Sequence, residues 1–463
     1  MEKSICARDG FACRARRFYS GRLYPVLVMA LIFVAHTMAW ELPVLGVLVA
    51  LVGLGAAVSH DLRFLLPPLL GGVCMISLAH TPYLPTESDY FFTTESLAAL
   101  LSLGTLLLCF LVLFLVRNAK GTAPFSSLRL KWGFLGFFAA MTFSGLGQEN
   151  ALKNLLYGVG VGASFLLIYL LFGLFHPKTK ENAEHFLYTL TCIGLLALAE
   201  LLVVYLTAVE YDGWIPLKES VLVGWGTWTH AGAMAAMCVG APFYFARTAK
   251  RPLPYLLVGG MLTLSLLLSA SRAAWLYGLL VLGAALLLSC LGGSNRRAMR
   301  IITGVLLVLV LAAVLLLLPK ILAFLSVFIK LGVGDNGRFE LWKKAIDAFL
   351  AAPVFGRGFF NSDVVLSFPP IMPYLYHNTP LQMLGAAGGV GALLYLWHRA
   401  ETVRLAWARR HSPLSLFLLL APLALVLTSL TDEHIFHIYP AFFYAVALSL
   451  AEGRYEDGPV LQK

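Results

Sequence analysis

Long apolar segments alternate with short polar ones along most of the chain. Segments such as 96–116, 186–209 and 301–318 carry few or no charges over the roughly 17–25 residues that a helix needs to cross a bilayer. Backbone groups in lipid must bond within their own segment, so these runs predict transmembrane helices. About fourteen spans are predicted in this way, near residues 23–40, 42–58, 62–80, 96–116, 132–147, 154–175, 186–209, 230–246, 253–270, 273–291, 301–318, 381–397, 413–431 and 435–451.

This pattern predicts an all-α protein, a polytopic transmembrane helical bundle of about 12–14 spans. A basic cytoplasmic tail at 1–22 precedes the transmembrane helices of 23–318, and one large non-cytoplasmic loop covers 319–380. The C-terminal transmembrane helices follow at 381–451, and a cytoplasmic tail at 452–463 ends the chain.

Composition and charge support a membrane protein and give it an orientation. The chain is 59% hydrophobic and 13% charged. Most of its 34 Lys and Arg residues fall on one side if the N-terminus is cytoplasmic, which is the positive-inside pattern. We therefore expect a multi-pass protein of the inner or cytoplasmic membrane, with both termini in the cytoplasm. The basic residues on the cytoplasmic side account for most of the net charge of +10, so this charge does not require a nucleic-acid partner. The expected partner is the lipid bilayer. The seven cysteines form no CxxC pair and are interpreted as packing residues.

The stretch DNGRFELWKKAIDAFLAAPVFGRGF in the large loop reads as a soluble amphipathic helix and a turn. The spacing predicts a helix from Arg338 to Leu350, ended by Pro353, that lies on the membrane surface or caps the bundle. Its polar arc holds Glu340, Lys343, Lys344 and Asp347. Arg338 falls in the apolar arc instead. It either snorkels to the interface or, with the free N–H groups of the first turn, binds an anion.

Two further polar residues stand out among apolar neighbours. Arg272 is the single charge near the middle of the stretch 253–291, so we expect a tight turn that places it at the non-cytoplasmic face. His377 and Asn378 come directly before an apolar helix rich in Gly and Ala, whose small residues allow close approach. A histidine there can take up a proton near neutral pH. The alternatives are a loop charge at the interface and a capping histidine.

The remaining candidates carry weaker signals. Arg357 lies between two glycines, His230 begins a helix after an aromatic loop, and Asp432 lies in the last non-cytoplasmic turn beside Glu433 and His434. Solvated loop charges are the alternative for each. The sequence contains no Walker A run, HExxH or GxSxG motif, and no metal-ligand spacing of carboxylates on that side. Arginines and a histidine with few carboxylates favour a metal-free, cofactor-free site for a lipid-linked phosphate.

Three motifs occur in order between about 253 and 397: SASR at the hairpin, R-x-x-x-W followed by P-x-x-G-x-G in the loop, and HN before the Gly-rich helix. Together they resemble the O-antigen ligase and polymerase family. The resemblance implies a metal-independent, inverting glycosyltransferase. Its donor is a polyprenyl-diphosphate-linked glycan, and its acceptor is a hydroxyl of a glycan or glycolipid.

The resemblance also implies roles for individual residues. Arg272 and Arg338 match the arginines that hold the diphosphate, and His377 matches the proposed base, while Arg357 occupies a variable position. We expect Arg357, Asn378, His230 and Asp432 to contact substrate. Two other classes stay open: a transporter or flippase for lipid-linked oligosaccharide, and a non-enzymatic assembly protein. Clustering of the charges at one membrane face, rather than at midplane, favours the enzyme.

Overall fold

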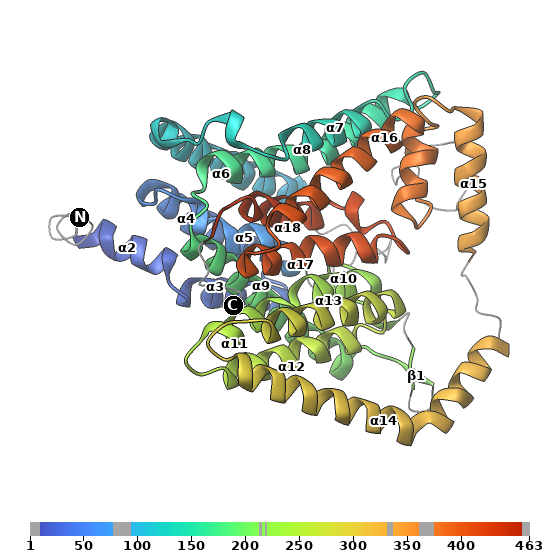
Figure 1. Ribbon diagram of the computed structural model, residues 1–463. Coiled ribbons are helices and arrows are strands. Elements are labelled where there is room, and N and C mark those ends of the chain that lie inside the picture. The colour runs from blue at the N-terminus through green and yellow to red at the C-terminus, as the bar shows by residue number, and fades with distance from the viewer. Residues whose placement is uncertain are drawn as a thin grey trace.

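The computed structural model describes residues 10–76, 94–212, 215–217, 220–330, 337–360 and 375–455. Helices account for most of these residues (Figure 1). The described part also contains one small antiparallel hairpin, formed by β1 (Tyr211–Asp212) and β2 (Ile215–Pro216). The predicted all-α class is therefore confirmed.

The first half of the chain forms one helix in the predicted N-terminal tail and further helices at the predicted spans, of which residues 77–80 lie outside the described part. They are α2 (Gly10–Ser20), α3 (Leu23–Met38), α4 (Glu41–Val58), α5 (Leu66–Gly71), α6 (Thr94–Asn118), α7 (Lys131–Thr142), α8 (Ala151–Phe175) and α9 (Lys180–Thr207). Short 3-10 helices flank α5 at η1 (Leu62–Phe64) and η2 (Gly72–Met75), and two more, η5 (Ala119–Gly121) and η6 (Phe125–Ser127), connect α6 to α7.

The second half continues in the same way. Its helices are α10 (Trp228–Cys238), α11 (Ala241–Thr248), α12 (Leu253–Leu268), α13 (Arg272–Cys290), α14 (Arg296–Lys330), α15 (Arg338–Ala351), α16 (Thr379–Ala408), α17 (Pro413–Thr428) and α18 (Ile438–Ala451). A 3-10 helix, η8 (His434–Phe436), lies between α17 and α18.

Seven of the described helices are long and apolar enough to cross a membrane: α4, α6, α8, α9, α13, α14 and α16. The bent pair α2–α3 adds an eighth if it is one span. Other predicted spans fall on shorter apolar helices, including α12 and α17. The segment predicted at 132–147 is the twelve-residue α7, and the segment at 230–246 divides into α10 and α11. The multi-pass character is confirmed, and these two segments form shorter helices than the prediction gave them.

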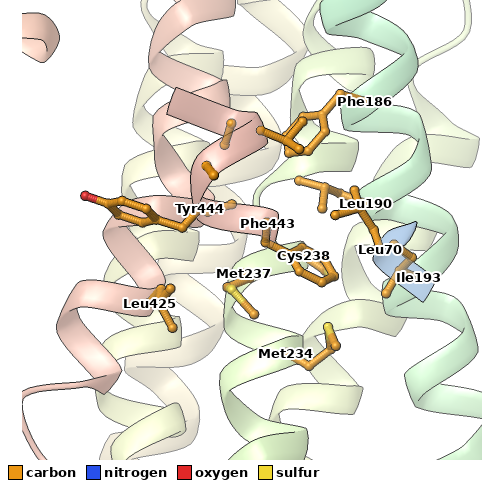
Figure 2. Packing of buried hydrophobic residues seen from close by; sticks show 14 of the residues in the cluster. Leu70, Phe186, Leu190, Ile193, Met234, Met237, Cys238, Leu425, Phe443 and Tyr444 are labelled. Atoms are coloured by element: carbon orange, nitrogen blue, oxygen red, sulfur yellow. The ribbon is translucent and has the colours of Figure 1, made fainter. Parts of the chain in front are cut away.

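The core lies where α9, α10, α17 and α18 meet (Figure 2). Phe186, Leu190 and Ile193 of α9 pack with Met234 and Met237 of α10, and all five side chains are buried. In contrast, α14 lies on the outside of α13 (Figure 1). Over residues 301–320 it exposes nearly all its apolar side chains. Such exposure is expected where the neighbour is lipid rather than water.

The segment predicted as the large loop begins within a helix. Helix α14 continues through Pro319 to Lys330, and α15 follows at Arg338–Ala351, in agreement with the predicted amphipathic helix. α15 packs on α16 (Figure 1). Its buried face is narrow, consisting of Ala345 and Ala348, and contacts Tyr376.

Helix α16 is broken at Gly388, where φ is 66°. The turn after α15 enters this break. The backbone N–H groups of Arg357 and Gly358 donate to the carbonyls of Gly385 and Ala386, both at 2.9 Å, and Gly389 N donates to the carbonyl of Pro353 at 2.8 Å. The small residues of this segment therefore admit a loop backbone as well as the neighbouring helix α7. This pairing fixes the P-x-x-G-x-G turn against α16.

Candidate functional site

His377 lies at the junction of α16 with the turn between α17 and α18. Asn378 is the N-cap of α16: its Oδ1 accepts from Leu381 N at 3.0 Å, and its Nδ2 donates to the carbonyl of Leu430 at 2.8 Å. The backbone N–H of Thr379 donates to the carbonyl of Ser429 at 3.0 Å. These bonds hold His377 in a left-handed conformation, with φ 51°, that costs free energy for a residue other than glycine.

Two carboxylates hold the imidazole of His377. Its Nδ1 donates to Asp432 Oδ1 at 3.0 Å and lies 2.6 Å from Glu433 Oε2. Both acidic side chains are more than nine-tenths buried, whereas 40% of the His377 side chain is exposed. Because Nδ1 faces the acids, Nε2 is the ring nitrogen that can meet a substrate.

The acids change the protonation of this group. Burial disfavours the imidazolium, but hydrogen bonds to Asp432 and Glu433 and their charges outweigh burial and raise the pKa of His377 to about 10. Burial, together with the charge of Asp432, raises the pKa of Glu433 to about 8. Asp432 shows the opposite shift: burial opposes its ionisation, yet His434, Glu433 and His377 hold its pKa well below the usual range. At neutral pH the group therefore holds an imidazolium, an ionised Asp432 and a protonated Glu433.

Three more histidines continue from Asp432 into the bundle. His434 Nε2 lies 3.7 Å from Asp432 Oδ2, and the ring centroids of His434 and His230 are 5.3 Å apart. His230 Nε2 lies 3.5 Å from His437 Nε2. Burial and the charge of His434 lower the pKa of His437 to about 4, against the pull of Asp432. His437 is therefore neutral at physiological pH, whereas His377 is charged.

An apolar cavity of about 870 Å³ ends at this group. His230, His437 and Tyr157 line the cavity. Leu375, which is two residues before His377 in the sequence, also lines it. Its remaining walls are aliphatic and aromatic side chains of α4, α5, η2, α6, α8 and α18, among them Leu48, Val52, Leu69, Leu107, Val161 and Phe442. The cavity can receive an apolar chain whose polar end meets the histidines.

The three arginines predicted for the site lie at different depths. Arg338 is half-buried at the first position of α15. Burial of His434 is the main cause that lowers the pKa of His434, and the positive charge of Arg338 also lowers it. Arg357 is half-buried in the turn held by α16. Arg272 is exposed at the start of α13, and its hairpin packs on α10 at Gly232, where an added Cβ would lie 2.9 Å from Ser271 Cβ. Gly232 is two residues from His230.

The described contacts therefore join His377 to Asp432 and His230 to His437. Arg272 and Arg357 lie on other segments, at the start of α13 and in the turn held by α16. The prediction that Arg272, Arg338 and His377 meet in one cavity stays a prediction. Sequence reasoning named Glu433 and His434 only as weak candidates beside Asp432, and it did not single out His437. The signal for them was their position beside Asp432 in the last turn.

His377, Asp432 and Glu433 also have the donors for a divalent cation. Their ligand atoms all lie within 4.8 Å of one another. One imidazole and two carboxylates suit several divalent ions. The expectation of a metal-free site therefore needs a direct test with a chelator.

Residues 256–396 match the family model described as O-antigen ligase. The matched region runs from α12 into α16 and includes Arg272, Arg338, Arg357, His377 and Asn378. No curated protein matches the chain.

Proposed function

We propose that this chain is a member of the O-antigen ligase family and that it transfers a glycan from a polyprenyl-diphosphate carrier to an acceptor hydroxyl. The reaction takes place at the outer face of the inner or cytoplasmic membrane, with both termini in the cytoplasm. The acceptor is either another glycan, in a polymerase, or a glycolipid, in a ligase.

The observation that carries this proposal is an apolar cavity whose polar end is formed by His230 and His437 and which reaches Leu375, two residues before His377. The cavity suits a polyprenyl tail, and its His230 and His437 end suits the diphosphate of the donor. His377 Nε2 faces the side on which an acceptor would arrive, because Nδ1 is held by Asp432.

The transfer is a single displacement with inversion. The acceptor oxygen bonds to the anomeric carbon while the bond from that carbon to the phosphate oxygen breaks. The electron pair leaves on the diphosphate, where negative charge accumulates. Arg338 and Arg272 stabilise this charge more in the transition state than in the ground state. Bidentate guanidinium groups match the phosphate oxygens.

His377 Nε2 accepts the proton of the acceptor hydroxyl as the new bond forms. This step needs the neutral ring with hydrogen on Nδ1, the tautomer that donates to Asp432. Because the pKa of His377 is raised to about 10, the reactive form becomes more abundant as the pH rises. Asp432 then stabilises the imidazolium that the reaction produces.

The test uses purified protein, a polyprenyl-diphosphate-linked glycan and two acceptors, a free glycan and a glycolipid. Release of polyprenyl diphosphate with formation of a longer or lipid-attached glycan supports the proposal, and the product distinguishes polymerase from ligase. His377→Ala should lose transfer but still bind the donor. Normal transfer by that variant would overturn the assigned base, and loss of transfer with a chelator would overturn the metal-free mechanism. Donor movement across vesicles without transfer would favour the flippase.

A further inference from the structure

A second cavity, of about 700 Å³, lies at the other end of the bundle from His377. Residues of the α6–α7 and α8–α9 connections and the ends of α16 and α18 line it. Helix α8 separates the two cavities. Tyr157, near its start, lines the first, and His176, directly after its last residue, lines the second. At about 1.5 Å per residue, they are roughly 28 Å apart along the helix. The second cavity is therefore separate from the candidate site.

The wall of this cavity is strongly basic. Arg129, Lys178, Arg409 and Arg454 line it, and Glu452 is the single carboxylate among its lining residues. Four cations and one anion leave three positive charges in excess. Glu452 is already engaged: its Oε2 lies 2.8 Å from Lys178 Nζ, and its Oε1 accepts from the Tyr169 hydroxyl at 2.6 Å. The excess charge therefore has no counterion within the described wall.

Among these cations, Arg409 gives the strongest argument for a bound anion, because only 8% of its surface is exposed. One of its amino groups, Nη2, donates to the backbone carbonyl of Glu452. Its Nε–H has no acceptor among the residues that the structure describes. Burial and the charges of Arg129 and Arg454 lower the pKa of Arg409, against the opposing pull of Glu452. Burying a guanidinium with an unused donor next to like charges costs free energy, and a bound anion would offset this cost.

His176 supplies a second buried donor from another part of the chain. It is 2% exposed, and its Nδ1 accepts from Leu62 N at 3.1 Å. Burial, together with the charge of Arg63, lowers the pKa of His176 to about 4 despite the opposing Asp61, so the ring is neutral at physiological pH. The hydrogen of the neutral ring must then lie on Nε2. This N–H also has no acceptor within the described part of the chain.

We propose that this second cavity is a phosphate-binding site. Arg409 and His176 donate to the phosphate oxygens from buried positions, and Arg129 and Arg454 supply charge at the rim. Because α8 and α16 are long and apolar enough to cross a membrane, we expect the helix ends around the cavity to lie at the level of lipid headgroups, which favours the phosphate of an anionic phospholipid. A soluble phosphate would present the same oxygens. Positive-inside charges alone explain exposed arginines, but they do not explain two buried residues with an unused donor in the lining of one cavity. The proposal does not depend on the transfer reaction.

The experiment measures ligand binding by the purified full-length protein in two arms. The first uses nanodiscs of phosphatidylcholine with increasing phosphatidylglycerol, and the second uses inorganic phosphate in neutral detergent. The readouts are the midpoint of thermal unfolding and ligand retained in the native mass spectrum. A rise with phosphatidylglycerol alone identifies a headgroup site, and a rise with inorganic phosphate identifies a soluble anion. Absence of both overturns the proposal.

Two variants and a matched control make the test specific. Arg409→Gln, and separately the double variant Arg129→Gln with Arg454→Gln, should weaken binding about tenfold or more, the size expected for lost charged hydrogen bonds. The double variant changes only exposed side chains and decides the matter if Arg409→Gln fails to fold. The control is Arg410→Gln, which removes an exposed neighbouring charge bonded to the carbonyl of Trp407. Equal weakening in the control and the double variant would show general charge attraction and overturn the site.

Discussion

At the residue scale, the raised pKa of His377 makes a prediction that a purely structural histidine would not make. Asp432→Asn removes a negative charge that stabilises the imidazolium, so the pKa of His377 should fall. The rising limb of the plot of transfer rate against pH should then move to lower pH by about 1–3 units, the usual effect of one nearby charge. The maximal rate should also fall, because Asp432 no longer orients the ring. The measurement is initial transfer rate against pH.

The control for this prediction is Glu340→Gln, which neutralises an exposed carboxylate on α15 that pairs with Lys344. Its pH profile should match that of the unmodified protein. A transfer rate that falls as the pH rises toward 10 would contradict the base role. It would mean that His377 acts as a cation on the diphosphate instead.

Arg338 gives a second prediction at this scale. Arg338→Ala should reduce transfer about 10²–10³-fold, the typical cost of removing a contact to developing charge. Arg338→Lys should recover only part of the rate, since a single ammonium cannot reproduce the bidentate fork. Lys343→Ala is the matched control because Lys343 is exposed on the same helix. Full activity of Arg338→Ala in protein that inserts normally would favour the snorkelling interpretation.

Some site residues could be found from the sequence and others could not, for a physical reason. His377, Arg338 and Asp432 stood out because a charged or titratable side chain in an apolar setting is costly. The pairing of His377 with Asp432 joins residues 55 positions apart, and that of His230 with His437 joins residues 207 apart. Local sequence patterns do not predict contacts between residues that lie so far apart along the chain. Glu433 and His437 were therefore missed as members of the group.

At the element scale, the break in α16 is the feature that fixes the loop. An added Cβ at Gly388 would lie 2.4 Å from the carbonyl oxygen of Val354, and φ there is 66°. Gly388→Ala should therefore destabilise the fold by at least about 1–3 kcal/mol from backbone strain alone. The turn at Val354–Gly358 should lose its pairing, so transfer should fall as well. The measurement is thermal unfolding in detergent, with transfer rate as the second readout.

Gly283→Ala is the control for this substitution. Gly283 is a helical residue of α13, and an added Cβ there meets nothing within 4 Å. Alanine should be neutral or slightly stabilising at that position. Equal stability of the two variants would mean that the turn does not hold α16 in its broken form.

The sequence predicted elements better than it predicted how they interlock. The bounds of α15 follow from the apolar period and Pro353, and they agree with the structure. The Gly-rich start of α16 was read as a surface for close helix approach. That reading was incomplete, because a backbone segment from residues 353–358 bonds into the helix itself. Hydropathy also does not give helix length, since the apolar segment predicted at 132–147 is the twelve-residue helix α7.

At the scale of the whole molecule, the two cavities imply opposite sides of the membrane. We expect α15 and the His377 group on the outer side and the Arg409 cavity on the cytoplasmic side, because the basic residues of the chain concentrate at the latter end. Lys343→Cys and Arg410→Cys place a probe at each end, and both parent side chains are exposed. The background must lack the native cysteines, since Cys109 is exposed.

A membrane-impermeant maleimide applied to intact cells should label Lys343→Cys at once. Arg410→Cys should react only after the membrane is permeabilised. The physical reason is the free-energy cost of moving arginines across a membrane during insertion, which keeps them on the cytoplasmic side. Transfer activity of each variant shows that the labelled protein is correctly folded. Labelling of both positions from outside would contradict the predicted orientation, and labelling of Arg410→Cys alone would invert it. The inverted result would place His377 in the cytoplasm, where it could not serve transfer at the outer face.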